Sequence, residues 1–194
     1  IEQIAALLAE LPSDSSVSIT KPSELAKELF THRGSGTLVR KGKRIQSATT
    51  WSAINKHKLR GLLESGFSKK ILPSYFRDNK PSKIYFSEDY RAALVLLKVN
   101  GAAYLDKFAV AEDAQGEGLG SAAWNVMRKE NPKLFWRSRR SNPINEFYMQ
   151  ACDGCIKFLH WTVFWYGLSG LEEIQAAVTY CLERPASFHE DSGQ

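Results

Sequence analysis

The fold is decided by residues 104–148, YLDKFAVAEDAQGEGLGSAAWNVMRKENPKLFWRSRRSNPINEFY. The stretch begins with a strand-like run, and the glycine loop QGEGLG at residues 115–120 leads into an amphipathic segment. A second strand-like run, LFWRSR, follows at residues 134–139. Asn142 and Pro143 then begin a helix, because Asn caps helices and Pro fits the first turn. The stretch therefore predicts a strand, a glycine loop opening a helix, a second strand and a capped helix.

The segment just upstream predicts how the first of these strands is paired. Residues 92–99, AALVLLKV, form a near-continuous apolar run, as expected for a strand covered on both faces. Only Asn100 and Gly101 separate this run from the strand at residues 102–110, which is a hairpin signature and makes the pair antiparallel. We therefore predict an α+β fold with a mixed, mostly antiparallel central sheet flanked by helices, unlike a Rossmann fold.

Weaker patterns extend the prediction to the rest of the chain. They indicate a helix at residues 1–11, a strand at 17–19, a helix from Thr20, a hairpin at 37–46, a helix from about Trp51 capped by Thr50, a strand at 83–86, a strand region at 156–166 and a last helix at about 171–182. We interpret residues 1–188 as one domain, with an N-terminal lobe to about residue 86 and a second lobe at about 87–188. Residues 189–194 form a polar tail. The chain begins at Ile1 without an initiator Met, so we expect it to be a fragment of a longer protein.

Composition and charge narrow the possible partners. The chain has 194 residues, 43% of them hydrophobic, but no apolar run approaches the roughly 20 residues that span a bilayer. The net charge of +5 comes with scattered basic clusters, which are typical of solvated faces. We therefore expect no membrane partner, and nucleic-acid binding, which would show as a strongly salt-dependent affinity, is not the preferred interpretation. Only the arginines at residues 137–140 lie in an otherwise apolar strand, where charges need a partner.

Three cysteines without regular spacing argue against a disulfide framework and for a reducing compartment. Cys152 and Cys155 form a CxxC pair, which could be a redox pair or half of a zinc site. We interpret it as a loop before a strand and expect no metal.

The glycine loop predicts a phosphate-bearing ligand. Glycines let the backbone approach a ligand closely, and successive amides at a helix start form an anion cradle. The loop lacks the Lys-Ser/Thr pair of a P-loop, and its antiparallel setting disfavours a dinucleotide. A coenzyme A pyrophosphate loop of an N-acetyltransferase remains, although a glycine turn before a helix is commonly only a turn.

Three cations and one tyrosine extend this constellation. Arg137 and Arg139 lie two residues apart on a strand and so point to one face, where paired guanidinium groups suit carboxylates; an ion pair with an acid elsewhere in the chain is the alternative. Lys107 is a further cation in an apolar strand. Tyr148 lies about a turn and a half into the helix that Asn142 begins, from where its phenol could protonate a departing thiolate. Packing in the core is the alternative for this tyrosine.

YLDKF, QGEGLG, LFWRSRRSNPINEFY and FWYGL, in this order, closely resemble the N-acetyltransferase domain of N-acetylglutamate synthases, including vertebrate-like and bifunctional synthase/kinase forms. The resemblance covers about residues 1–188. It implies a GNAT (acyl-CoA N-acyltransferase) fold and transfer of the acetyl group of acetyl-CoA to the amino group of L-glutamate, giving N-acetyl-L-glutamate and coenzyme A, by direct attack in a ternary complex. This reaction begins arginine biosynthesis or supplies a urea-cycle activator.

The resemblance also implies roles for individual residues. Lys69, Lys107, Arg137 and Arg139 correspond to glutamate ligands, with Asn142 and Lys107 at the reaction centre and Tyr148 as the general acid. The implied acetyl-CoA contacts are Phe108, Ala109, Val110, Gln115, Gly116, Glu117, Gly118, Leu119 and Gly120.

Family members carry an amino-acid-kinase domain before this one, through which we expect the protein to form homo-oligomers. The implied compartment is the cytoplasm of a bacterium or the mitochondrial matrix of a eukaryote. Two other functions stay open: a GNAT enzyme for another small acidic amine, and a catalytically degenerate domain that binds acetyl-CoA as a regulator.

Overall fold

A computed structural model describes residues 7, 10–11, 16–25, 37–40 and 44–189. The chain divides into two compact units, Ile1–Lys43 and Arg44–Gln194. The expected lobe boundary near residue 86 stays a prediction. Within the described residues, no helix is long and apolar enough to cross a membrane.

The first unit contains a two-stranded sheet. β1 (Ser16–Ile19) pairs antiparallel with β2 (Thr37–Arg40), which confirms the strand expected at residues 17–19. The hairpin expected at residues 37–46 is wrong, because β3 (Ile45–Ala48) pairs with β4 of the second unit's sheet and packs Ile45 against the core there. The helix expected at residues 1–11 lies mostly outside the described residues. The helix expected from Thr20 starts as a 3-10 turn, Pro22–Glu24, and its later part is also outside them.

The second unit is built on a seven-stranded sheet in the order β3-β4-β5-β6-β7-β9-β8. Its remaining strands are β4 (Lys83–Ser87), β5 (Ala92–Val99), β6 (Ala102–Val110), β7 (Leu134–Arg139), β8 (Gly154–Lys157) and β9 (Trp161–Tyr166). β6 and β7 are parallel, and every other neighbouring pair is antiparallel. The predicted mixed, mostly antiparallel sheet is therefore confirmed.

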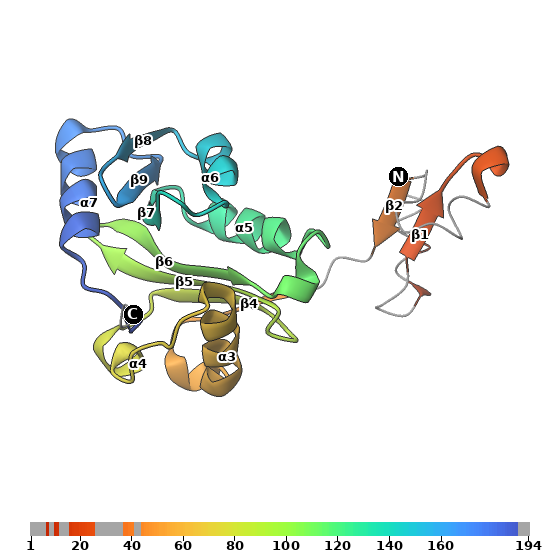
Figure 1. The fold of residues 1–194 in the computed structure, drawn as a ribbon, viewed down its shortest axis with the longest axis horizontal. Helices are drawn as coiled ribbons and strands as arrows, with labels where there is room; N and C mark the ends of the chain where they lie inside the picture. Colours follow the sequence, from red (N-terminus) through yellow and green to blue (C-terminus); the bar gives the residue numbers. More distant parts are fainter. Residues whose placement is uncertain (1–6, 8–9, 12–15, 26–36, 41–43, 190–194) are drawn as a thin grey trace, which may run out of the picture. The chain divides into compact units, whose positions relative to one another are not determined.

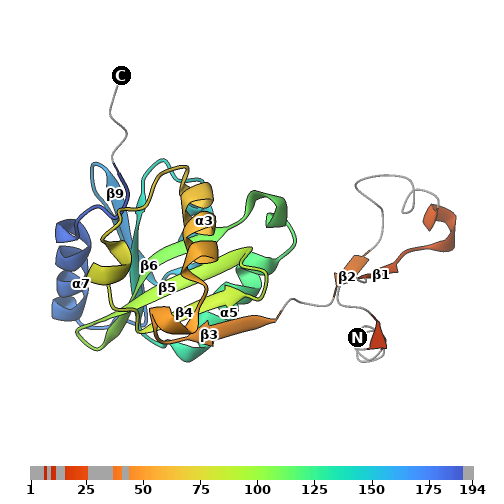
Figure 2. The same ribbon diagram turned by 90° about the horizontal axis from the view of Figure 1, so that it is seen from below.

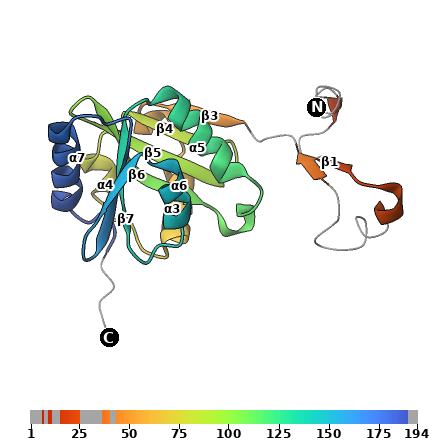
Figure 3. The same cartoon turned by 90° about the horizontal axis from the view of Figure 1, so that it is seen from above.

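Helices cover both faces of this sheet. They are α3 (Lys56–Phe67), α4 (Tyr75–Asp78), α5 (Leu119–Glu130), α6 (Asn145–Ala151) and α7 (Leu171–Glu183). α3 and α5 lie on opposite sides of the sheet (Figure 1). α3 crosses β5 and β6 on one side (Figure 2), and α5 and α6 lie on the other (Figure 3). The double cover explains the apolar run of β5, which is buried from residue 92 to residue 97.

Two expected boundaries differ in the structure. Asn55, not Thr50, caps α3, since its Oδ1 accepts a hydrogen bond from the Lys58 amide at 3.0 Å, and Thr50 precedes a short 3-10 turn. The strand region expected at residues 156–166 is two strands, β8 and β9. A tight turn, closed by a 2.7 Å bond from the Phe158 amide to the Trp161 carbonyl, folds β9 back along β8.

A β-bulge in β6 shapes the centre of the sheet. Lys107 lies opposite Val95 and Leu105 lies opposite Leu96, so Asp106 is an extra residue without a partner on β5. Neighbouring side chains of a regular strand point to opposite faces, but a bulge re-aims them. Asp106 and Lys107 consequently both reach Tyr75 of α4, on the same side of the sheet.

β6 and β7 then separate. Only three residues of each strand pair: Ala103 lies opposite Leu134, Tyr104 opposite Phe135 and Leu105 opposite Trp136. Beyond these positions the last part of β6 is paired on its β5 side alone, so its backbone groups face an opening toward β7.

Candidate active site

A cavity of about 1260 Å³ occupies the place where β6 and β7 separate. Its wall comes from both strands, the glycine loop, the start of α6 and the segment after α7. It brings together nearly all of the residues predicted from the sequence: Lys69, Lys107, Phe108, Ala109, Val110, Gln115, Gly116, Gly118, Gly120, Arg137, Arg139, Asn142 and Tyr148. Residues up to 79 positions apart in the chain thus meet at one site.

Glu117 and Leu119, which were also predicted as ligand contacts, do not line the cavity. Leu119 is only 4% exposed and packs against Ala92 and Ala114. Glu117 instead pairs with Arg91, whose Nη1 lies 3.1 Å from its Oε2. These two side chains hold the loop in place rather than face a ligand.

The glycine loop leaves backbone donors free at the start of α5. Gly118 is the N-cap of α5, with φ of 77°, and no side chain caps the helix there. The first amides of a helix have no intrahelical acceptor and carry the positive end of the helix dipole. A Cβ atom at Gly116 or Gly118 would meet nothing within 4 Å, so the backbone borders open space. The geometry suits an anionic group.

Two arginines of the cavity wall stack on the same aromatic ring, that of Trp161. The guanidinium carbons of Arg137 and Arg139 lie 4.2 and 4.1 Å from the centre of the Trp161 ring. Arg137 also donates to the carbonyls of Cys181 and Pro185, and so caps the end of α7. Arg139 is exposed and, among the described residues, its guanidinium has no hydrogen bond or ion pair to the protein. Neither arginine therefore has an acid partner within the part of the chain that the structure describes.

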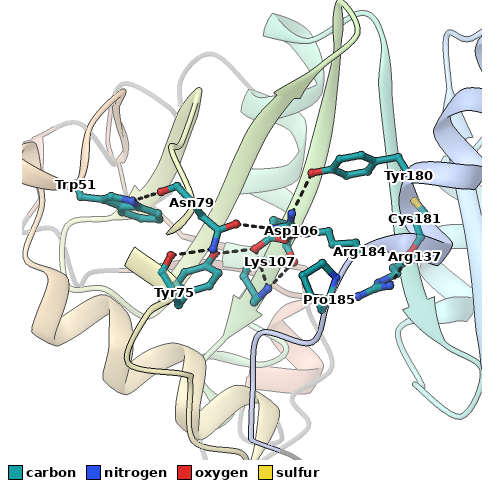
Figure 4. Close-up of polar contacts among 10 residues, drawn as sticks. All are labelled: Trp51, Tyr75, Asn79, Asp106, Lys107, Arg137, Tyr180, Cys181, Arg184 and Pro185. Carbon is teal, nitrogen blue, oxygen red and sulfur yellow. Dashed lines mark hydrogen bonds and ion pairs between the residues drawn. The ribbon is translucent and has the colours of Figure 1, made fainter. Parts of the chain in front are cut away.

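Lys107 lies in a buried ionic network (Figure 4). Its Nζ is 2.7 Å from Asp106 Oδ2, and the two side chains are 4% and 2% exposed. The same carboxylate accepts a hydrogen bond from the Tyr75 hydroxyl at 2.7 Å and another from Arg184 Nε at 2.7 Å. Arg184 follows α7, so the network joins β6, α4 and the end of the last helix.

The network changes the acidity of its members. Burial alone would raise the pKa of Asp106, but the charges of Lys107 and Arg184 outweigh it and hold that pKa below its usual value. Burial lowers the pKa of Lys107, and the attraction of Asp106 opposes this effect. Among the cavity-lining residues, Lys69, Lys107, Arg137, Arg139 and Arg184 are cations and Asp106 is the one acid. The cavity therefore favours an anionic ligand.

Tyr148 approaches the cavity from the α5 and α6 side of the sheet. Its ring packs against those of Trp136, Phe164 and Trp124, with centroids 5.3, 5.5 and 5.7 Å away. Its hydroxyl makes no hydrogen bond within the described part of the chain, and burial raises its pKa. The hydroxyl is thus a protonated donor available to a ligand, although the ring also belongs to the core.

Asn142 lines the cavity next to this tyrosine. Its Oδ1 accepts a hydrogen bond from the Ile144 amide at 3.2 Å, which fixes the turn that enters α6. The N-cap of α6 is Ile144, two residues later than the cap predicted from the sequence, and the helix begins at Asn145.

Sequence reasoning missed several residues of the wall, among them Asp106, Trp161, Arg184 and Phe188. Asp106 carried a signal, since a carboxylate beside Lys107 in an apolar strand needs a partner. Trp161 lies in the strand region expected at residues 156–166, but nothing in the sequence pattern marks it as a residue of the site. Nothing local marks Arg184, whose contact with Asp106 spans 78 positions of the chain.

Comparisons with known proteins complete the description of the site. Residues 45–184 match the family model of the NAT domain, the N-acetyltransferase of N-acetylglutamate synthase. A Xanthomonas campestris protein named acetylglutamate kinase is 55% identical over 95% of this chain and 44% of its own length. The mitochondrial N-acetylglutamate synthase of Danio rerio is 39% identical over 97% of this chain and 37% of its own length. The chain thus spans less than half of the length of these relatives.

A solved structure shares the fold. An acetyltransferase of the GNAT family from Bacteroides thetaiotaomicron superposes with a TM-score of 0.53 at 14% identity, over 72% of this chain and 95% of that protein. The GNAT fold expected from the sequence is confirmed.

Proposed function

Because the chain belongs to the N-acetyltransferase family of N-acetylglutamate synthases, we propose that it transfers the acetyl group of acetyl-CoA to the α-amino group of L-glutamate. The observation that carries the proposal is a single cavity that is bordered by a helix N-terminus and lined by five cations and one acid. A phosphate-bearing donor and an acidic acceptor are the pair of ligands that this distribution of charge favours.

Acetyl-CoA is assigned to the glycine loop and to the free edge of β6. The amides at the start of α5 would hold the pyrophosphate. The backbone of Phe108, Ala109 and Val110 would pair with the amides of the extended pantetheine arm, as an added strand pairs with a sheet edge. This assignment places the thioester near the point where β6 and β7 separate.

Glutamate is assigned to the side of the sheet that carries the cations. Within the described residues the Arg139 guanidinium makes no hydrogen bond, and Lys107 and Lys69 line the same cavity. Two carboxylates on the acceptor explain why several cations converge, since each carboxylate accepts charge-assisted hydrogen bonds. The acceptor amine would meet the thioester from this side.

The reaction is direct attack in a ternary complex. The α-ammonium group of glutamate first gives a proton to water. The free amine nitrogen then forms a bond to the carbonyl carbon of the thioester, the carbon–sulfur bond breaks, and a second proton leaves the nitrogen to water. Tyr148, protonated at neutral pH, gives its proton to the departing thiolate and regains one from water. Asn142 lines the reaction centre, and holding both reactants in one site lowers the entropic barrier.

A coenzyme A release assay tests the proposal. The chain is incubated with acetyl-CoA and, in parallel, with glutamate, aspartate, glutamine, lysine or no amino acid. We expect glutamate-dependent release, with N-acetylglutamate identified by mass spectrometry. Release with another acidic amine instead of glutamate would reassign the acceptor, and acetyl-CoA binding without release for any amine would favour a regulatory domain.

The longer protein is part of the proposal. The name of the Xanthomonas campestris relative and the share of it that this chain spans support an amino-acid-kinase domain beside this one, through which the protein would form homo-oligomers. The compartment would be the cytoplasm of a bacterium or the mitochondrial matrix of a eukaryote, as the name of the Danio rerio relative suggests.

A further inference from the structure

The segment that follows α7 forms one wall of the cavity. Residues 186–189 line it. The segment is held in place by hydrogen bonds from the Leu72 amide to the Ser187 carbonyl, 3.0 Å, and from the His189 amide to the Lys70 carbonyl, 2.9 Å. Ile71 and Phe188 form an antiparallel bridge between these bonds. The family match ends at residue 184, so most of this wall lies beyond it.

Arg184, at the start of the segment, uses its donors inside the protein. Its Nε donates to Asp106 at 2.7 Å, its Nη1 to the Tyr180 hydroxyl at 3.0 Å and its Nη2 to Asn79 Oδ1 at 2.7 Å. The side chain is 12% exposed. Arg184 can therefore influence a ligand mainly through Asp106, which it shares with Lys107 (Figure 4).

Because Arg184 and Lys107 both contact Asp106, the net charge of this group of residues depends on Arg184. Asp106 is a single carboxylate with two cations against it, Lys107 and Arg184. If Asp106 formed an ion pair with Lys107 alone, the pair would have no net charge and would attract a further anion only weakly. With Arg184 on the other oxygen, one positive charge is left over in a buried region, where Coulomb interactions are strong.

Phe188 restricts the same ammonium group. Lys107 Nζ lies 4.9 Å from the centre of the Tyr75 ring and 5.3 Å from that of the Phe188 ring. Phe188 is in turn packed on Phe67, with ring centres 4.8 Å apart. A cation between two ring faces is attracted by both, so the C-terminal wall helps to fix where the ammonium lies.

We propose that Arg184 and Phe188 are positioning residues that hold the Lys107 ammonium, with its charge uncompensated, on the cavity wall where it receives a carboxylate of the amino-acid substrate. The inference rests on the proposed function for the identity of that substrate. It makes the segment after α7 a determinant of acceptor affinity, whereas the glycine loop determines donor affinity.

Steady-state kinetics provide the first test. Arg184→Met should raise the KM for glutamate about tenfold or more, the size expected for losing a charge-assisted contact, and should change the KM for acetyl-CoA by less than about twofold. Arg184→Lys keeps the charge and should restore part of the affinity. Phe188→Leu keeps the apolar volume and should raise the KM for glutamate about threefold. Arg128→Met is the matched control, because Arg128 also stacks on a tyrosine, 3.9 Å from the Tyr166 ring centre, but does not line the cavity.

Side-chain NMR of the Lys107 Cε, without substrate, provides a test that does not depend on turnover. The resonance is assigned by its loss in Lys107→Met. The charged or titratable groups that face this lysine are Asp106, Arg184, Arg137 and Tyr75. Arg184→Met removes a like charge and should raise the pKa of Lys107, Asp106→Asn should lower it, and Phe188→Leu should remove a ring-current shift.

The outcomes separate the two proposals. If the wild-type chain releases no coenzyme A with glutamate, the proposed function fails whatever the NMR shows. If the wild type is active but Arg184→Met behaves like Arg128→Met, or both KM values rise equally, the positioning role is wrong. If Arg184→Met does not fold, as shown by the loss of its cooperative melting transition, Arg184→Lys and Phe188→Leu are used in its place. An unchanged KM for glutamate in both of these variants would overturn the inference.

Discussion

Tyr148 lies in the cavity wall, where a general acid for the departing thiolate is needed. Its hydroxyl has no hydrogen-bond partner among the described residues, and burial raises its pKa, so it stays protonated at physiological pH. The surrounding rings of Trp136 and Phe164 hold it toward the cavity.

Tyr148→Phe should therefore lower kcat by roughly 10²–10⁴-fold, the usual range for a positioned proton donor, with little change in either KM. Because the ring is kept, packing and melting temperature should stay near those of the wild type. The measurement is coenzyme A release over a range of substrate concentrations. Full turnover in Tyr148→Phe would remove the tyrosine from the chemistry and leave it a core residue.

Arg137 and Arg139 share the Trp161 ring but differ in their other contacts. Arg137 donates to two carbonyls at the end of α7, whereas Arg139 makes no such bond within the described residues. Hydrogen bonds to a charged donor contribute about 1.5–3 kcal/mol each.

Arg139→Ala should thus raise the KM for glutamate strongly, leave the KM for acetyl-CoA nearly unchanged and barely affect the melting temperature. Arg137→Ala should raise the same KM and also lower the free energy of unfolding by roughly 2 kcal/mol or more. Kinetics and thermal melts on the same preparations check both. Equal destabilisation by the two substitutions would contradict the different roles assigned to them.

At the level of elements, Arg91 connects the turn before β5 to the glycine loop. Its guanidinium bonds to Glu117 at 3.1 Å, to the Asp113 carboxylate at 3.3 Å and to the Asp113 carbonyl at 2.8 Å. The Ser87 hydroxyl accepts from the Arg91 amide at 2.9 Å and so fixes the start of the connection. The loop conformation therefore depends on a residue outside the loop.

Arg91→Met should raise the KM for acetyl-CoA by about three- to tenfold, since the loop amides lose their fixed arrangement, while the KM for glutamate changes little. Because these groups are partly exposed, high salt should weaken the contacts of Arg91 in the wild type and should also raise the KM for acetyl-CoA. Lys133→Met is the control, as it breaks a comparable pair with Glu173, 2.7 Å long, away from the cavity. A rise in the KM for glutamate alone would show that the loop is not the element affected.

The elements that the sequence predicted well are those with local signals. The Asn100-Gly101 turn specifies the β5–β6 hairpin, and the glycines of residues 116–120 specify the start of α5. The error at residues 37–46 came from a pairing choice, because β3 joins a distant strand whose position no nearby residue encodes.

The residues of the candidate site also fall into those with a local sequence signal and those without one. Lys107, Arg137 and Tyr148 lie in segments whose pattern and resemblance mark them. The bulge that turns Asp106 beside Lys107 depends on the register with β5. Tyr75 lies on a four-residue helix, too short for a periodic signal. Contacts formed by packing between distant elements were therefore not predictable from the sequence.

For the whole molecule, buried tyrosines link folding to alkaline pH. Burial raises the pKa of Tyr75, Tyr85, Tyr104, Tyr148 and Tyr180 above the ordinary value of 10.0. Below pH 10 each hydroxyl is protonated in both states, so the contribution to stability is fully present. Above it the unfolded chain releases protons that the folded chain keeps, and stability is lost as pH rises.

Five such groups should lower the free energy of unfolding by up to about 7 kcal/mol per pH unit once the pH exceeds about 10. Lys107 acts in the opposite direction, because its lowered pKa makes the unfolded chain bind more protons near its own titration, but it is one group against five. Urea denaturation at successive pH values, with tyrosinate absorbance followed in parallel, measures the dependence. Tyr148→Phe removes one of the five titrating hydroxyls and should flatten the slope by about a fifth. A stability that stays level from about pH 9 to pH 11 would mean that these hydroxyls are hydrated rather than buried and that their pKa values are not raised.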